Sequence, residues 1–168
     1  MIIVREVVDV RNISDIIESY LKQIIEMNEQ GLAEIKRSEI ALKFNCVPSQ
    51  INYVINTRFT EERGYLVESK RGGGGYIRIL RVQPHSQKEL IEAMITQIAE
   101  ETTQTMAEDY VYRLLDEEVI TKREAKMIIA ATMRATLNVP LPLRDQLRAR
   151  ILSAVLVTLK YEQRKEGE

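Results

Sequence analysis

The chain has 168 residues, a net charge of -1 and one cysteine, Cys46. This length suits one ordinary domain or two small ones, and a lone cysteine excludes an internal disulfide and an all-thiolate metal site. No stretch approaches the roughly 20 apolar residues of a membrane span, and no signal-peptide cleavage site follows Met1–Val10, so we expect a cytoplasmic protein.

The charge is unevenly distributed along the chain. From Lys36 to Val82 there are nine basic and four acidic residues, a local charge of +5. From Gln83 onward, twelve basic residues face fourteen acidic ones. Local charge matters more than total charge for nucleic-acid binding. The first half is therefore the candidate phosphate-binding half.

A first helix is predicted to begin at Asn12, after an extension at residues 1–10 that has no clear period. Asn12 or Ser14 can cap it, and turn residues Asn28–Gly31 end it. Apolar residues recur at three- and four-residue steps, which predicts one buried face. That face comprises Ile13, Ile16, Ile17, Tyr20, Leu21, Ile24 and Ile25.

Two shorter helices follow a connection through Leu32 and Ile35. Ser38 is expected to cap the second helix, and Pro48 suits the first turn of a third helix that ends near Thr57. The residues expected to point inward are Ile40, Ala41 and Phe44 in the second helix, and Ile51, Val54 and Ile55 in the third. Two short helices followed by a hairpin are typical of a winged helix-turn-helix.

The other face of the third helix is polar but uncharged. It displays Ser49, Gln50, Asn52, Tyr53 and Asn56, with Thr57 and Arg58 at its end. These groups donate and accept hydrogen bonds, as base edges in a DNA major groove require. An ordinary solvent-facing surface is the alternative, but such surfaces favour Glu and Lys, and residues 49–57 contain neither.

A β-hairpin is predicted around residues 65–82, with a tip at residues 70–76. Alternating apolar and polar residues flank four consecutive glycines, which allow the main chain to approach a ligand closely. With Lys70 and Arg71 beside the glycines, the tip suits a narrow, negatively charged cleft such as a DNA minor groove. A P-loop is disfavoured because a strand follows Gly75. A merely solvated hairpin is the other alternative.

The second half is predicted to form four helices after a linker at residues 83–87. Ser86, Thr102 or Thr103, and Thr121 are the expected caps of the first three, and Glu124 completes a capping box with Thr121. The third helix is expected to continue through Met133 to Leu137 before a Pro-rich turn. The last helix, from about Leu143 to Tyr161, carries more apolar surface than three neighbours cover. We therefore expect a homodimer, with a monomeric bundle as the alternative.

The predicted fold is mainly α with a β-hairpin wing: an N-terminal winged helix-turn-helix followed by a C-terminal four-helix domain. The expected domains are residues 1–82 for DNA binding and 88–168 for dimerisation. One histidine and one cysteine that are remote in sequence form no nucleophile or metal motif, so neither enzyme activity nor a cofactor or metal is expected. The rival hypothesis is an adaptor that docks on a chaperone through its helical half.

Three segments resemble the CtsR family, the class-three stress-gene repressors of low-GC Gram-positive bacteria. They are the run Asn12–Glu18, the block Ile35–Ala41 continuing through Cys46–Phe59, and Gly64–Ile79 with its Arg71–Tyr76 tip. Residues 1–10 are not part of the family pattern.

The resemblance implies a homodimeric repressor that binds direct heptanucleotide repeats upstream of Clp protease and chaperone genes and leaves them on heat stress. It places Arg71 in the minor groove and gives the recognition-helix role to Ser49 through Arg58. The glycine tip is the implied heat-sensitive element. A protein-arginine kinase of the same regulon and a Clp ATPase or protease are implied as further partners.

The candidate DNA-binding residues from residue types and resemblance together lie in three groups. They are Lys36, Arg37 and Ser38; Ser49, Gln50, Asn52, Tyr53, Asn56, Thr57 and Arg58; and Lys70, Arg71, Gly72, Gly73, Gly74, Gly75 and Tyr76.

Overall fold

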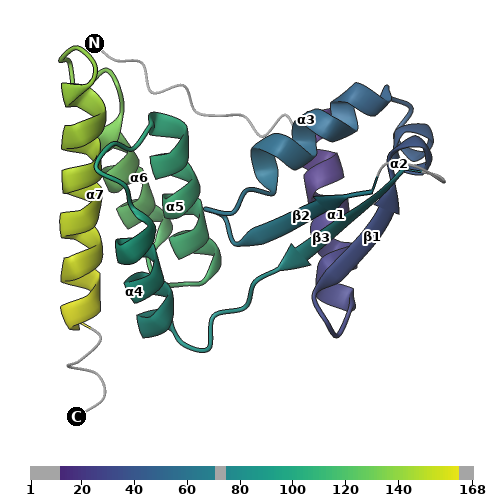
Figure 1. The fold of residues 1–168 in the computed structure, drawn as a ribbon, viewed down its shortest axis with the longest axis horizontal. Helices are drawn as coiled ribbons and strands as arrows, with labels where there is room; N and C mark the ends of the chain where they lie inside the picture. Colours follow the sequence, from purple (N-terminus) through teal and green to yellow (C-terminus); the bar gives the residue numbers. More distant parts are fainter. Residues whose placement is uncertain (1–11, 71–74, 163–168) are drawn as a thin grey trace. The chain divides into compact units, whose positions relative to one another are not determined.

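The computed structural model describes residues 12–70 and 75–162, which divide into two units between Val82 and Gln83 (Figure 1). The predicted wing tip Arg71–Gly74 and the extension at residues 1–10 lie outside the described residues. We call the two parts the N-terminal unit and the C-terminal unit and describe each by itself.

The N-terminal unit combines three helices with a three-stranded antiparallel sheet (Figure 1). The elements are α1 (Ile13–Met27), β1 (Leu32–Lys36), α2 (Arg37–Lys43), α3 (Pro48–Arg58), β2 (Tyr65–Ser69) and β3 (Tyr76–Arg81). The strand order is β1-β3-β2, so the hairpin β2–β3 is extended by a strand from earlier in the chain. This arrangement, with α2 and α3 ahead of the hairpin, is the predicted winged helix-turn-helix.

The core of this unit forms where α1 packs against α3 and the sheet. Local signals explain the helices: Asn12 and Asp15 form a capping box at α1, and Pro48 occupies the first turn of α3. Its fully buried side chains include Ile17, Leu21, Ile51, Val54, Ile77 and Ile79. Burial of Ile51, Val54 and Ile55 confirms the predicted inner face of α3.

Several local expectations are wrong. Leu32–Lys36 is a strand rather than a connection, because its partner β3 lies far along the chain and leaves no local signal. Ser38 does not cap α2: the N-cap is Lys36, which makes no side-chain capping bond. Ile13 and Ile16 are 37% and 41% exposed, because the buried stripe of α1 is narrower than its apolar pattern.

The C-terminal unit consists of four helices, as predicted. They are α4 (Gln87–Gln97), α5 (Gln104–Asp116), α6 (Lys122–Thr132) and α7 (Leu143–Glu162). Side-chain oxygens of Ser86, Thr103 and Thr121 each accept a hydrogen bond from the backbone N–H three residues later, which confirms these caps. The expected continuation of α6 to Leu137 is wrong, because the helix ends at Thr132.

A buried arginine closes one end of this bundle. Arg148 on α7 is 1% exposed, and its guanidinium donates to the Thr132 carbonyl at 2.8 Å and the Thr102 carbonyl at 2.9 Å. It also pairs with Asp145 on the same helix. A buried charge is tolerated only when it is paired and hydrogen-bonded, and these partners satisfy that condition. Arg148 therefore joins the end of α6, the start of α5 and α7.

Adjacent isoleucines in α1 test the burial pattern. Ile17→Ala should lower the free energy of unfolding by about 2–5 kcal/mol, because Ile17 is 0% exposed and its loss leaves a cavity. Ile16→Ala, the matched control, should cost less than about 1 kcal/mol because Ile16 is 41% exposed. Urea denaturation of both variants measures the difference. Equal costs would contradict the burial described for α1.

Candidate nucleic-acid interface

The helix pair α2 and α3 is joined by a four-residue turn at 44–47. Asn45 adopts a positive φ of 50°, and the Cys46 N–H donates to the Ala41 carbonyl at 2.9 Å. The two helices pack against each other, and Ile40, Ala41 and Ile51 lie in the core. The turn thus presents one face of α3 to the outside while the opposite face is buried.

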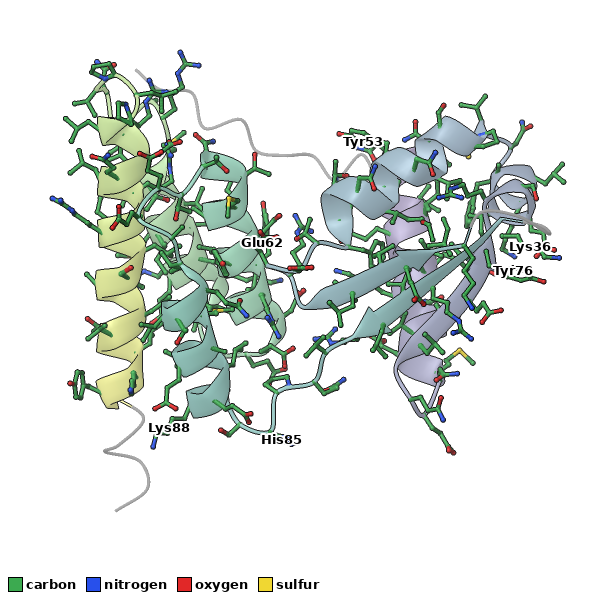
Figure 2. The ribbon with its side chains drawn as sticks, in the orientation of Figure 1. Lys36, Tyr53, Glu62, Tyr76, His85 and Lys88 are labelled. Atoms are coloured by element: carbon green, nitrogen blue, oxygen red, sulfur yellow. The ribbon has the colours of Figure 1, made fainter. Side chains whose placement is uncertain are left out.

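Four of the predicted residues lie on this outer face of α3: Ser49, Asn52, Tyr53 and Asn56 are all exposed. Tyr53 is 54% exposed and projects from the side of α3 that faces away from the sheet (Figure 2). The face carries hydroxyl and amide groups without an acidic side chain. Such a surface can approach a polyanion without charge repulsion and can bond to both donors and acceptors.

Gln50 does not belong to the open face as expected. Its Nε2 donates to the Ser14 hydroxyl at 2.7 Å, and the side chain is partly buried. Ser14 is itself 6% exposed on α1. The amide of Gln50 therefore holds the start of α3 against α1, which the residue pattern of α3 alone does not reveal.

The end of α3 is also engaged within the unit. Thr57 donates its hydroxyl to the Tyr53 carbonyl at 2.7 Å, and Arg58 lies 3.2 Å from a Glu18 carboxylate oxygen. Glu18 additionally pairs with Arg63 at 3.7 Å and Lys22 at 3.0 Å. Glu18 on α1 is thus a hub that orients α3 and the turn before β2, and the sequence analysis missed this role.

The wing strands bring distant basic residues together. Lys36 at the end of β1 pairs with Tyr76 at the start of β3, and the Lys70 N–H donates to the Tyr76 carbonyl at 3.0 Å. The Lys36 ammonium lies 5.3 Å from the centre of the Tyr76 ring, a cation–π geometry. Figure 2 labels both residues. A hydrogen bond to Glu39 raises the pKa of Lys36, so this cation stays protonated.

Gly75, the residue before β3, has a φ of +63°, which favours glycine. A Cβ added at Gly75 would meet no other atom of the described residues within 4 Å, so backbone conformation and not space is what favours glycine here. The predicted contacts Arg71, Gly72, Gly73 and Gly74 lie outside the described residues.

One arginine links the helix to the wing. Arg37, the first residue of α2, donates from Nε to Asn52 Oδ1 on α3 and from Nη2 to the Ser69 hydroxyl on β2 at 3.2 Å. Ser38 beside it is exposed. The structure therefore gathers Lys36, Arg37, Asn52 and the wing strands at one end of the sheet. Ser69 is a further site residue that only the strand register reveals.

Charge elsewhere on the sheet is balanced. Arg78 and Glu34 face each other in the β1–β3 register, with Nε and Oε2 2.9 Å apart. The Glu34 hydrogen bond raises the pKa of Arg78, which stays charged but paired. Among the residues that the structure describes, no cluster of His, Cys, Asp or Glu could hold a metal ion and no helix could cross a membrane.

The C-terminal unit carries an apolar groove between α6 and α7. Its volume is about 500 Å³. Its lining is mainly Ile120, Met127, Ile128, Ile151, Val155 and Leu159. Ile151, Val155 and Leu159 belong to the broad apolar stripe predicted for the last helix, and each stays partly exposed in this unit. The groove between α6 and α7 is therefore exposed apolar surface of the kind that marks an interaction site.

Two family models match the chain. One is described as the CtsR N-terminal HTH domain and matches residues 12–83. The other is described as the CtsR C-terminal dimerization domain and matches residues 86–157. The matched stretches include α1 to β3 and α4 to most of α7.

Named relatives are similar over most of the chain. The transcriptional regulator CtsR of Geobacillus stearothermophilus is 60% identical, covering 90% of this chain and 99% of the relative. The Bacillus subtilis (strain 168) protein of the same name is 56% identical, covering 90% and 98%. A crystal structure of CtsR in complex with a 26-bp DNA duplex has a TM-score of 0.80 and 60% identity, covering 89% of this chain and 99% of that chain.

The Glu18 hub predicts a measurable stability difference. Glu18→Gln should lower the free energy of unfolding by about 1–3 kcal/mol, because the side chain is 13% exposed and several cations lose their counter-charge. Glu34→Gln is the matched control: that pair is 43% exposed on each side, so its loss should cost less than about 1 kcal/mol. Chemical denaturation measures both changes. A negligible effect of Glu18→Gln would contradict the stabilising role assigned to Glu18.

Proposed function

We propose that this chain, which belongs to the CtsR family of transcriptional regulators, represses stress-response genes by binding operator DNA as a homodimer. The chain matches a helix-turn-helix family model and its relatives are named transcriptional regulators, so the chain is a regulator and not an enzyme. The proposed site of action is operator DNA in the cytoplasm.

The observation that carries this proposal is that the uncharged polar face of α3 lies beside the basic residues where the wing strands begin and end. Arg37 bonds to both Asn52 on α3 and Ser69 on β2, so the helix and the wing are held as one surface. Lys36 and Lys70 lie at the same end through their pairing with Tyr76. Phosphate contacts by such cations position a protein on DNA, whereas contacts to base edges supply specificity.

We assign the recognition role to the helix at residues 48–58 in the major groove and the minor-groove role to the wing at residues 70–76. In this assignment Ser49, Asn52, Tyr53 and Asn56 contact base edges or phosphate, while Gln50, Thr57 and Arg58 hold the helix in place through the bonds described above. Arg71 enters the minor groove, where a narrow cleft concentrates negative potential. Residues 1–82 form the DNA-binding domain, 83–87 the linker and 88–168 the dimerisation domain.

Dimerisation through the α6–α7 groove is supported by its apolar lining and by the half-covered side chains of α7. A second copy of the chain is the proposed occupant, because the family model that matches this unit is described as a dimerization domain. Two copies would place two DNA-binding units on neighbouring operator repeats, which raises affinity through linkage of the two binding events.

Control of Clp protease and chaperone genes, release on heat stress, and contacts with a protein-arginine kinase or a Clp ATPase or protease are further parts of the proposal. These parts of the proposal are supported by the chain's membership of the CtsR family. A physical reason supports heat release: ordering glycine backbone on DNA costs about 1–2 kcal/mol per residue, and this entropic cost rises with temperature. Phosphorylation of a wing arginine would place negative charge against the DNA backbone.

Arg71→Ala tests the wing. We expect operator affinity to fall about 10- to 100-fold, because a charged hydrogen bond contributes about 1.5–3 kcal/mol. Gel-shift titration on the upstream region of the chain's own gene measures this loss. Arg123→Ala on α6, which removes the same charge from the other unit, should bind like the parent.

Unchanged binding by Arg71→Ala would remove the wing from the mechanism. Repeating the titration at increasing salt concentrations distinguishes the repressor hypothesis from the adaptor hypothesis. Affinity that falls steeply with salt supports DNA binding, whereas absence of DNA binding with salt-insensitive binding to a Clp ATPase would favour the adaptor hypothesis.

Val155→Asp tests the groove as the dimer interface. A carboxylate buried in an apolar interface is costly, so sedimentation should show monomers at concentrations where the parent is dimeric. Val157→Asp is the matched control, because Val157 is 40% exposed and does not line the groove. Retention of the dimer by Val155→Asp would place the interface elsewhere.

A further inference from the structure

The bond between Arg37 and Asn52 determines which way round the Asn52 amide lies. Arg37 Nε is a donor, and its partner is Oδ1 of Asn52. The flipped amide would turn the Nδ2 donors toward the Nε donor, which cannot form a hydrogen bond. The amide oxygen therefore faces the guanidinium, and the amide's own two hydrogens lie at its other end.

The guanidinium is held in this position from a second side. Its Nη2 donates to Ser69 Oγ at 3.2 Å, and Ser69 is fixed by its pairing with Ile77 in the β2–β3 ladder. A guanidinium presents its donors in a rigid planar fork, so two bonded edges restrict its orientation. Arg37 thus reaches Asn52 from a position determined by the wing strands, and the rotamer of Asn52 depends on both.

A free asparagine matches adenine, because its oxygen accepts from the adenine amino group while its nitrogen donates to N7. In this structure a cation already fills one of the oxygen's two acceptor positions and places its positive charge beside the oxygen. An adenine or cytosine amino group that approached Oδ1 would meet the positively charged guanidinium. Guanine O6 and N7, or thymine O4, would instead meet the Nδ2 donors of Asn52, with the positive charge of Arg37 behind them.

We propose that Arg37 orients Asn52 so that the amide presents its Nδ2 donors to one base, and that this arrangement selects guanine or thymine over adenine at that position. This inference rests on the proposed function, since it assigns a specificity to the same DNA-binding face. Asn52 is the contacting residue. Arg37 is a positioning residue that sets the amide orientation and adds positive charge, and Ser69 holds Arg37 in place.

Selection of bound sequences from a random duplex library tests the pair. Full-length parent, Asn52→Ala and Arg37→Met are each used to enrich duplexes, which are then sequenced. The base position that Asn52 contacts is the one whose preference disappears in Asn52→Ala. There the parent should prefer guanine or thymine over adenine by about tenfold. Arg37→Met frees the amide to turn, so this preference should shrink to about twofold or reverse toward adenine.

Ser69→Ala is the matched control for the wing contact. It removes one of the two bonds that hold Arg37 but keeps the Arg37–Asn52 bond, so it should retain most of the preference with weaker overall binding. A phosphate-only role for Arg37 makes a different prediction: Arg37→Met would weaken every sequence uniformly and leave the base preference of the parent.

The outcomes separate the two levels of the proposal. If the parent enriches no sequence, the proposed function itself fails. If the parent enriches a defined site but Arg37→Met retains its base preference, or Asn52→Ala changes none, only the paired recognition is overturned. A parent preference for adenine at the Asn52 position would also overturn it. Circular dichroism of each variant establishes that changes in preference occur in folded protein.

Discussion

The pairing of β1 with β3 is the constraint on which the DNA-binding face depends. A two-stranded hairpin alone is marginally stable in water, and a third strand anchors it to the unit. Because β1 runs directly into α2, the register that sets Lys36 opposite Tyr76 also sets the start of α2 beside the wing. Arg37 then spans the short distance to α3 and β2. The geometry of the face follows from one strand register.

Features encoded by neighbouring residues could be predicted from the sequence. The helix α3 and its buried Ile51, Val54 and Ile55, the capping box at Thr121 and the strands around the glycines all leave signals within a few residues. Their physical causes are local: a proline in a first turn, a side chain that accepts an N–H, and a two-residue alternation. The mainly helical fold with a hairpin wing is confirmed for this reason.

Features that depend on distant partners could not be predicted in this way. Gln50 matched the pattern of an exposed polar face, but its amide donates a hydrogen bond to the Ser14 hydroxyl on α1. Arg58 closes α3 as expected, yet its charge is committed to Glu18 and Asp15. Ser69 carries no signal of its own and becomes important only because the strand register brings it to Arg37. In each case the deciding contact joins different elements, so no local pattern could contain it.

The buried Arg148 has a consequence for how the C-terminal unit assembles. Once the bundle is packed, a shift of the α6 end or of the segment before α5 would leave this buried guanidinium without a carbonyl partner, which is costly for a charge away from water. The buried guanidinium therefore links the packing of α7 to the end of α6 and to the segment before α5. In the proposed dimer, each subunit would therefore offer its partner an α7 whose position is already set by contacts inside its own bundle.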